Sequence, residues 1–247
     1  MSRWENLQYL RATVARIERG GLAEGGDDSA LPLGVADIDR ALGEGGLRRG
    51  ALHEISGTAA TGLAAVIAGR AAWCGESVLW CGAGRGRGGL YPPGLAMLGL
   101  PPSSLLLVDC RNERELLAVA EEGLRNAGLA ALLLEVSRMP DMTALRRLQL
   151  AAEAGGVLGL LLCPGATRRH GAGWRRDARS AGAMAPDMLP PSPATSRWRA
   201  SHAPAGPGGS FRWRLELLRC RGGGAGKWMV DWNEKTHCLA LVSPSGD

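Results

Sequence analysis

A strand, a glycine-containing turn and the start of a helix are predicted for the segment ALHEISGTAATGLAAVIAG, residues 51–69. Gly57 and Gly62 have the spacing of the two glycines in Gly-x-x-x-x-Gly-Lys-[Ser/Thr], the loop that binds phosphates in nucleotide-hydrolysing proteins. Leu63 and Ala64 stand where that loop has a lysine for the β- and γ-phosphates and a hydroxyl for Mg²⁺. We therefore predict a degenerate phosphate loop, with no catalytic residue, no cofactor and no nucleotide hydrolysis.

Short apolar runs alternate with helical patterns between residues 31 and 164. Each run is nearly continuous in apolar residues, as expected for parallel strands covered on both faces. The runs lie at residues 51–55, 77–81, 105–109, 131–136 and 157–163. Repeated strand–helix–strand units predict an α/β fold, with a mostly parallel sheet flanked by helices.

Two helix starts carry their own capping signals. Asn112 with Glu115 has the spacing of a capping box, and the helix that follows should end before Gly128. Asp141 can cap a second helix, which should run to the glycine pair at 155–156. Both helices lie between predicted strands, in agreement with the alternation.

Residues 211–247 have a different pattern, with polar and apolar residues alternating around the turn GGGAG. Residues 212–219 and 227–232 are predicted to form a hairpin, and residues 238–242 a third strand, so the chain should end in antiparallel structure. A short strand is also expected near 196–200. The tryptophans of these strands are interpreted as core or interface anchors: Trp198, Trp213, Trp228 and Trp232.

An amphipathic helix is predicted at residues 4–18, within an amino-terminal segment 1–19. Its apolar stripe recurs at steps of three and four and consists of Leu7, Leu10, Val14 and Ile17. Residues 20–30, rich in glycine and acidic residues, are expected to be a flexible linker. The stripe could pack on the chain's own core or on a neighbouring subunit or partner, and the sequence leaves both open.

The region 165–210 is rich in Gly, Ala, Pro and Arg and has almost no apolar periodicity. Residues 165–247 as a whole carry 13 Lys or Arg against six Asp or Glu. Interleaved arginine and tryptophan can pair with phosphates and stack on bases, so this region is a candidate for binding single-stranded DNA. The candidate residues are Arg168, Arg169, Trp174, Arg175 and Arg176, and a solvated linker is the alternative.

A second glycine pattern is a candidate for dinucleotide binding. Gly84, Gly86 and Gly89 spell Gly-x-Gly-x-x-Gly after a predicted strand, and Asp109 follows twenty residues later. Tyr91-Pro92-Pro93 delays the next helix, whose amino terminus should therefore miss the pyrophosphate. An NAD-binding enzyme is kept as an alternative that this spacing disfavours.

No metal site is predicted. His53-Glu54 lacks the second histidine of a zinc-protease motif, so both residues should belong to a strand, with Glu54 in a polar contact at its end. His170, His202 and His237 share no ligand spacing. The six cysteines form no Cys-x-x-Cys pair and are interpreted as buried free thiols in a reducing compartment. Without a signal peptide or an apolar run of ~18 residues, we expect a cytoplasmic protein that does not span a membrane.

The segment LPLGVADIDRALGEGGLRRGALHEISG, residues 31–57, resembles the lead into the phosphate loop of RecA recombinases. LAALLLEVS resembles their second catalytic strand and places Glu135 where those proteins keep an aspartate. The resemblance also implies a catalytic glutamate just after Cys81, and GAGRGRGG offers none. A RecA-like core with altered catalytic elements is implied.

The combination of further segments resembles the ImuA family, named for inducible mutagenesis. The matching segments are Gly45–Glu54, Arg146–Ala154, Thr195–Ala200, Arg212–Gly223 and Lys227–Trp232. The resemblance implies a non-catalytic accessory protein of SOS-induced, error-prone translesion DNA synthesis. Its implied partners are ImuB and an error-prone replicative-type DNA polymerase, and it would be nucleoid-associated when active. Contact with RecA, contact with single-stranded DNA, homo-oligomerisation and a SulA-like role in inhibiting cell division are left open.

Overall fold

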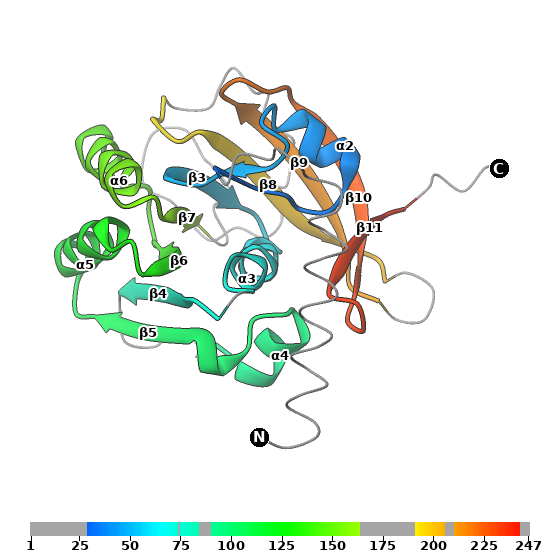
Figure 1. Cartoon of the computed structure of the whole chain (residues 1–247), viewed down its shortest axis with the longest axis horizontal. Helices are drawn as coiled ribbons and strands as arrows, with labels where there is room; N and C mark the ends of the chain where they lie inside the picture. Colours follow the sequence, from blue (N-terminus) through cyan, green and yellow to red (C-terminus); the bar gives the residue numbers. More distant parts are fainter. Residues whose placement is uncertain (1–28, 74, 84–89, 164–190, 206–209, 243–247) are drawn as a thin grey trace.

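The structure is a computed structural model and describes residues 29–73, 75–83, 90–163, 191–205 and 210–242 (Figure 1). Its strands are β1 (Ala30–Leu31), β2 (Leu47–Arg48), β3 (Ala51–Ser56), β4 (Ser77–Ala83), β5 (Leu105–Cys110), β6 (Leu129–Glu135), β7 (Leu158–Cys163), β8 (Ser196–Ala203), β9 (Arg212–Cys220), β10 (Gly226–Asn233) and β11 (Cys238–Leu241). Its helices are α2 (Ala36–Ala41), α3 (Ala60–Ala71), α4 (Pro92–Met97), η1 (Pro102–Ser104), α5 (Glu113–Arg125) and α6 (Met142–Gly155).

Nine strands form one sheet, in the order β11-β10-β9-β8-β3-β7-β6-β4-β5, and β1 and β2 form a separate pair. The six strands from β8 to β5 are parallel, and β9, β10 and β11 extend the sheet in antiparallel pairing. The predicted fold class is confirmed. The carboxy-terminal strands continue the central sheet, because β8 pairs directly with β3.

Helices cover the two faces of the sheet unequally. α5 and α6 lie side by side on one face, and α3 lies on the other, against β6, β7 and β8 (Figure 1). Each face has its own apolar cluster, and the larger one lies on the α3 side. Trp198, Trp213 and Trp232 are almost fully buried in that larger cluster, as their alternation with charged residues predicted.

Both predicted helix caps form. The Asn112 side chain accepts a hydrogen bond from the amide of Glu115, and the Asp141 side chain accepts one from the amide of Ala144. The Glu115 carboxylate reaches back to the amide of Arg111 rather than to that of Asn112, so the reciprocal half of the capping box is shifted by one residue. The second helix ends at Gly156 in the left-handed conformation, φ 71°.

Two predictions about burial are wrong. The run at 105–109 forms β5, which is an edge strand with Leu106 and Leu107 more than half exposed, so it is not covered on both faces. Among the described cysteines, Cys220 is only partly buried and Cys238 is exposed. For β5 and for Cys238 on β11 the errors arise because an apolar run does not reveal whether its strand lies at the centre or the edge of a sheet, whereas Cys220 is the last residue of the inner strand β9. No helix in the described ranges is long and apolar enough to cross a membrane.

Candidate functional site

The turn between β3 and α3 is where the sequence predicts a degenerate phosphate loop. Gly57 has φ 99°, and a Cβ there would lie 2.2 Å from the carbonyl oxygen of Ala200 on β8. Only glycine permits both this backbone conformation and this close approach. β8 therefore closes one side of the turn.

Backbone groups of this turn are already engaged with the protein. The amide of Ala59 donates to the carbonyl of Ala200 at 3.1 Å, and the amide of Ala60 donates to the carbonyl of Gly57 at 3.2 Å. The hydroxyl of Thr58 accepts from the amide of His202, also on β8, at 3.2 Å. A phosphate loop works because its amides point at the ligand, and here these two amides serve the fold.

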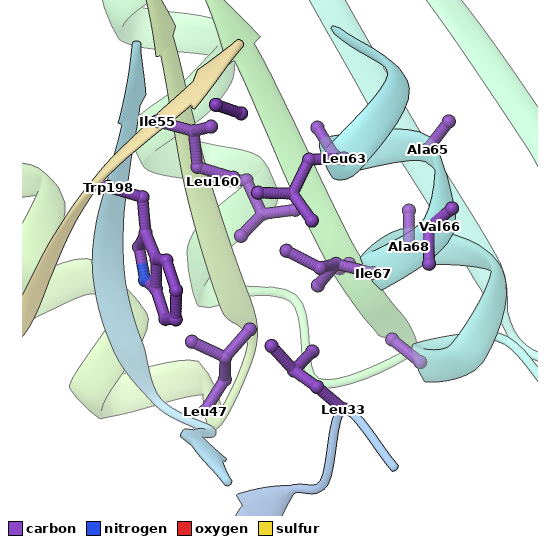
Figure 2. Close-up of a cluster of buried hydrophobic side chains, with 14 of the residues drawn as sticks. Leu33, Leu47, Ile55, Leu63, Ala65, Val66, Ile67, Ala68, Leu160 and Trp198 are labelled. Carbon is purple, nitrogen blue, oxygen red and sulfur yellow. The ribbon is translucent and has the colours of Figure 1, made fainter. Parts of the chain in front are cut away.

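The side chains at the lysine and hydroxyl positions belong to the hydrophobic core. Leu63 and Ala64 are 1% and 0% exposed. Figure 2 shows Leu63 directed from α3 toward Leu160 of β7 and Ile55 of β3. Because α3 begins at Ala60, both residues lie within its first turns rather than at its open end. Leu63 and Ala64, which stand at the lysine and hydroxyl positions of a working loop, therefore contribute to the packing of the helix.

Trp213 covers the second glycine of the pattern. A Cβ on Gly62 would lie 3.2 Å from the Cζ2 atom of the Trp213 indole, which projects from β9 and is 2% exposed. Its indole nitrogen has no hydrogen-bond partner among the described residues. An aromatic ring thus lies against the helix start near which a nucleotide would bind in a working loop.

Glu135 ends β6 and is half-buried, two strands away from β3 in the sheet. Asp109 is exposed near the end of the edge strand β5. The glycines at 84, 86 and 89 lie outside the described residues. The helix after them, α4, begins at Pro92 with Tyr91 as its capping residue, as late as the sequence predicts.

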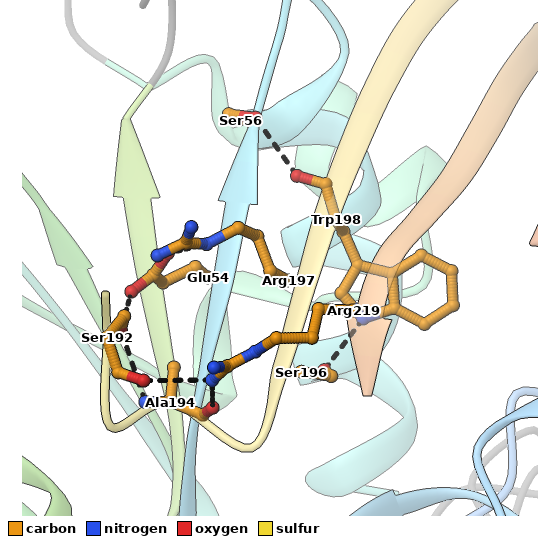
Figure 3. A network of polar contacts seen from close by, with 8 residues as sticks. All are labelled: Glu54, Ser56, Ser192, Ala194, Ser196, Arg197, Trp198 and Arg219. Atoms are coloured by element: carbon orange, nitrogen blue, oxygen red, sulfur yellow. Dashed lines mark hydrogen bonds and ion pairs between the residues drawn. The ribbon is translucent and has the colours of Figure 1, made fainter. Parts of the chain in front are cut away.

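A buried polar network joins β3 to β8 (Figure 3). The Glu54 carboxylate pairs with the Arg197 guanidinium at 2.5 Å and accepts a hydrogen bond from the Ser192 hydroxyl. The side chains of Glu54 and Arg197 are 4% and 8% exposed. The Arg219 guanidinium on β9 holds the same segment by donating to the carbonyls of Ser192 and Ala194. The polar contact predicted for Glu54 exists, and its partner is 143 residues away.

His53 forms a second polar contact between these strands. Its Nε2 lies 2.9 Å from the carbonyl oxygen of Arg48, which can only accept, so Nε2 carries the proton. Its Nδ1 then accepts from the Ser196 hydroxyl at 2.7 Å, and the same oxygen accepts from the Trp198 indole at 2.9 Å. Burial lowers the pKa of His53 to about 4, against the weaker opposing effect of the hydrogen bond to Arg48.

We expect the stability of the chain to fall between pH 7 and pH 5 because of His53. Its pKa is lower in the folded than in the unfolded chain, so the unfolded state binds the extra proton first as the pH falls. The loss over this window should be about 2 kcal/mol. Urea unfolding at several pH values measures it. H53Q should flatten the pH dependence, and equal slopes in H53Q and the unmodified chain would contradict the prediction.

Sequence comparison finds relatives over most of the chain. Protein ImuA from Caulobacter vibrioides, from strains NA1000 / CB15N and CB 15, is 36% identical over 235 residues, covering 88% of this chain and 90% of the relative. The chain belongs to the ImuA family. No family sequence model matches it.

The crystal structure of the RadB recombinase shares the fold of this ImuA-family chain. It superposes with a TM-score of 0.58 over 86% of this chain and 100% of the recombinase, at 18% sequence identity. At this identity the likeness shows the fold alone. The predicted RecA-like architecture is thereby confirmed for a member of the ImuA family.

Several candidate residues of this ImuA-family chain lie outside the described residues. They are the basic cluster Arg168, Arg169, Trp174, Arg175 and Arg176, and the amino-terminal stripe Leu7, Leu10, Val14 and Ile17. Sequence reasoning missed Arg197 and Ser192 as partners of Glu54, and it missed Trp213 as the cover of Gly62. An arginine within the apolar, tryptophan-containing strand TSRWRA was the available signal for a buried ion pair.

Proposed function

We propose that this ImuA-family chain is a non-catalytic, RecA-like accessory protein of SOS-induced, error-prone translesion DNA synthesis. It scaffolds or regulates a mutagenic complex with ImuB and an error-prone replicative-type DNA polymerase. Family membership supports the pathway and the partners. The closed turn at Gly57 supports the absence of catalysis, and it is the observation on which the proposal rests.

A nucleotide-driven RecA-like protein needs a phosphate held by amides, a lysine and a metal-bound hydroxyl. Here Leu63 and Ala64 are core residues, and Trp213 packs against the helix start. Loss of the charge-assisted contacts removes both affinity for nucleotide and stabilisation of the transition state. What the chain retains is the RecA-like fold without its nucleotide-binding contacts, and we expect this fold to bind partners.

Co-elution in gel filtration tests the partner proposal. The full chain is mixed with ImuB, with the polymerase and with both, and a single larger species is expected only when ImuB is present. A truncation at residue 164 is unsuitable, because it would remove β8, β9, β10 and β11 from the central sheet. Replacement of residues 165–189 by a short Gly-Ser linker keeps these strands and tests whether the basic region contributes to partner binding. Separate elution of all three proteins would overturn the scaffold role.

Direct contact with single-stranded DNA is the second part of the proposal. Its support is the surplus of arginine around Trp174 in the sequence. Changing Arg168, Arg169, Arg175 and Arg176 together to glutamine should reduce the slope of log K against log salt by up to about 3, because each phosphate contact on a single strand contributes about 0.7. Fluorescence anisotropy with a labelled oligonucleotide across a salt series measures this slope.

The matched control removes four positive charges elsewhere. It changes four arginines with well exposed side chains to glutamine: Arg40, Arg111, Arg138 and Arg147. Both variants lose four positive charges. If residues 168–176 form a specific DNA site, the slope of log K against log salt should therefore be reduced only in the variant that changes Arg168, Arg169, Arg175 and Arg176. Equal effects would show a non-specific electrostatic attraction and would overturn the assignment of DNA contact to residues 168–176.

A further inference from the structure

A cavity of about 380 Å³ lies at the end of α3 that is remote from the Gly57 turn. It opens where α3 meets the turn after α4 and the turn between β10 and β11. Its main side chains are Val66, Arg70, Trp73, Leu98, Trp232 and His237. Neither the degenerate loop nor the Glu54 network contributes to it, so it is a separate feature of the molecule.

The walls of this cavity are held by contacts within the protein. The Trp232 indole nitrogen donates to the carbonyl of Met97 at 2.9 Å, and the His237 ring stacks on Trp232 with an interplanar angle of 10°. A Cβ on Gly69 would lie 2.3 Å from the carbonyl oxygen of Gly99, so α3 and the turn after α4 touch through their backbones. The cavity is therefore a preformed site.

The chemistry of the cavity favours an apolar occupant. Among the described residues that line it, Arg70 is the one with a formal charge at neutral pH, and its Nε donates to the carbonyl of Pro32. Aromatic and aliphatic side chains form most of the remaining wall. Trp73, in the cavity wall, is 39% exposed. A concave surface lined mainly by apolar side chains indicates an interaction site.

The chain itself supplies a candidate occupant close to this cavity. Gly34 lines the cavity and lies five residues after Ser29, whose carbonyl accepts from the amide of Arg49. The 28 residues before Ser29 contain the predicted helix at 4–18, which would be about 22 Å long. The linker from residue 20 to residue 28 can span up to roughly 30 Å. The helix can therefore reach the cavity without leaving its own molecule.

We propose that the amino-terminal helix of the same chain packs its stripe of Leu7, Leu10, Val14 and Ile17 over this cavity. The short linker gives the helix an effective concentration on the order of millimolar at the site, far above that of a second copy at micromolar concentration. Docking also buries the apolar stripe, which a tethered helix would otherwise expose. This inference is independent of the proposed role in DNA synthesis.

Chemical crosslinking tests the docking, using Cys238, an exposed thiol in the cavity wall. V14C is combined with C74S in the full-length chain and treated with a short bismaleimide, and linked peptides are identified by mass spectrometry. The control is A12C in the same background, because residue 12 lies on the opposite side of the predicted helix from the stripe. We expect the Val14-to-Cys238 link to form within the monomer, about tenfold faster than the control link, with a rate that is unchanged on dilution.

The other outcomes each overturn the proposal. A link found only in dimers, and weakened by dilution, would assign the site to a second copy of the chain. Equal linking from positions 12 and 14 would show that the helix is tethered but does not dock. A second measurement is hydrogen exchange at Leu98, Gly99 and His237 in the unmodified chain and in L10D. Protection should fall in L10D while far-UV circular dichroism shows an intact core, and unchanged protection would also contradict docking.

Discussion

Replacement of Glu54 by alanine should lower the free energy of unfolding by about 3–5 kcal/mol. The change removes the carboxylate that pairs inside the sheet with the Arg197 guanidinium, whose side chain is 8% exposed. It also removes the acceptor of the Ser192 hydroxyl. A buried charge that loses its partner keeps the full cost of leaving water, which is why one substitution has such a large effect. Urea denaturation at pH 7 measures it.

Two comparisons separate this effect from simple loss of volume. E54M with R197M removes both charges and keeps apolar bulk, so it should recover most of the stability lost in E54A. E115A removes the partner of the exposed Arg111 guanidinium, and its effect should be much smaller than that of E54A. A fall of less than about 1 kcal/mol in E54A would mean that the pair is hydrated, and it would contradict the network drawn in Figure 3.

Rebuilding the phosphate-loop sequence should fail to restore nucleotide binding. In L63K with A64T the lysine would replace a side chain that is 1% exposed and packs between α3 and the sheet. We expect no saturable binding of a fluorescent ATP analogue with Mg²⁺ in the micromolar range. We also expect the protein to lose about 3–5 kcal/mol of stability, because the ammonium group has no buried partner at this position.

A lysine at another position of the same helix provides the control. T61K places lysine two residues earlier in the same helix, at a partly exposed site, and should cost about 1 kcal/mol or less. Tight, Mg²⁺-dependent ATP binding by L63K with A64T, or by the unmodified chain, would overturn both the closed-turn interpretation and the non-catalytic role. Loss of stability without binding is the result that agrees with Ala200 and Trp213 closing the turn.

The sequence predicts the local elements of this fold well because they depend on neighbouring residues. The apolar runs from residue 51 to 163 set the five strands β3 to β7, and Asn112 and Asp141 set the starts of the helices α5 and α6. The hairpin of β9 and β10 also follows from local alternation around a glycine turn. These features need only periodicity and caps, which lie within a few residues of one another.

The features that the sequence did not predict depend on residues far apart in the chain. Nothing local shows that β8 inserts beside β3, that Ala200 reaches Gly57, or that Arg197 meets Glu54 across 143 residues. The cavity beside α3 likewise combines residues from α3, the turn after α4, β10 and the turn before β11. The exposed edge strand β5 was misjudged for the same reason, since its neighbours decide its burial.

The position of β8 has a consequence for how the polypeptide is made. β3 is among the first strands to leave the ribosome, yet one of its two neighbours is synthesised about 140 residues later. Until then Glu54 has no counter-ion and one backbone edge of β3 is open, which makes the nascent chain a target for chaperones and for aggregation. Pairings between such distant strands also slow folding after release. Prematurely terminated products that end before residue 196 should therefore be degraded rather than accumulate as a smaller, independent domain.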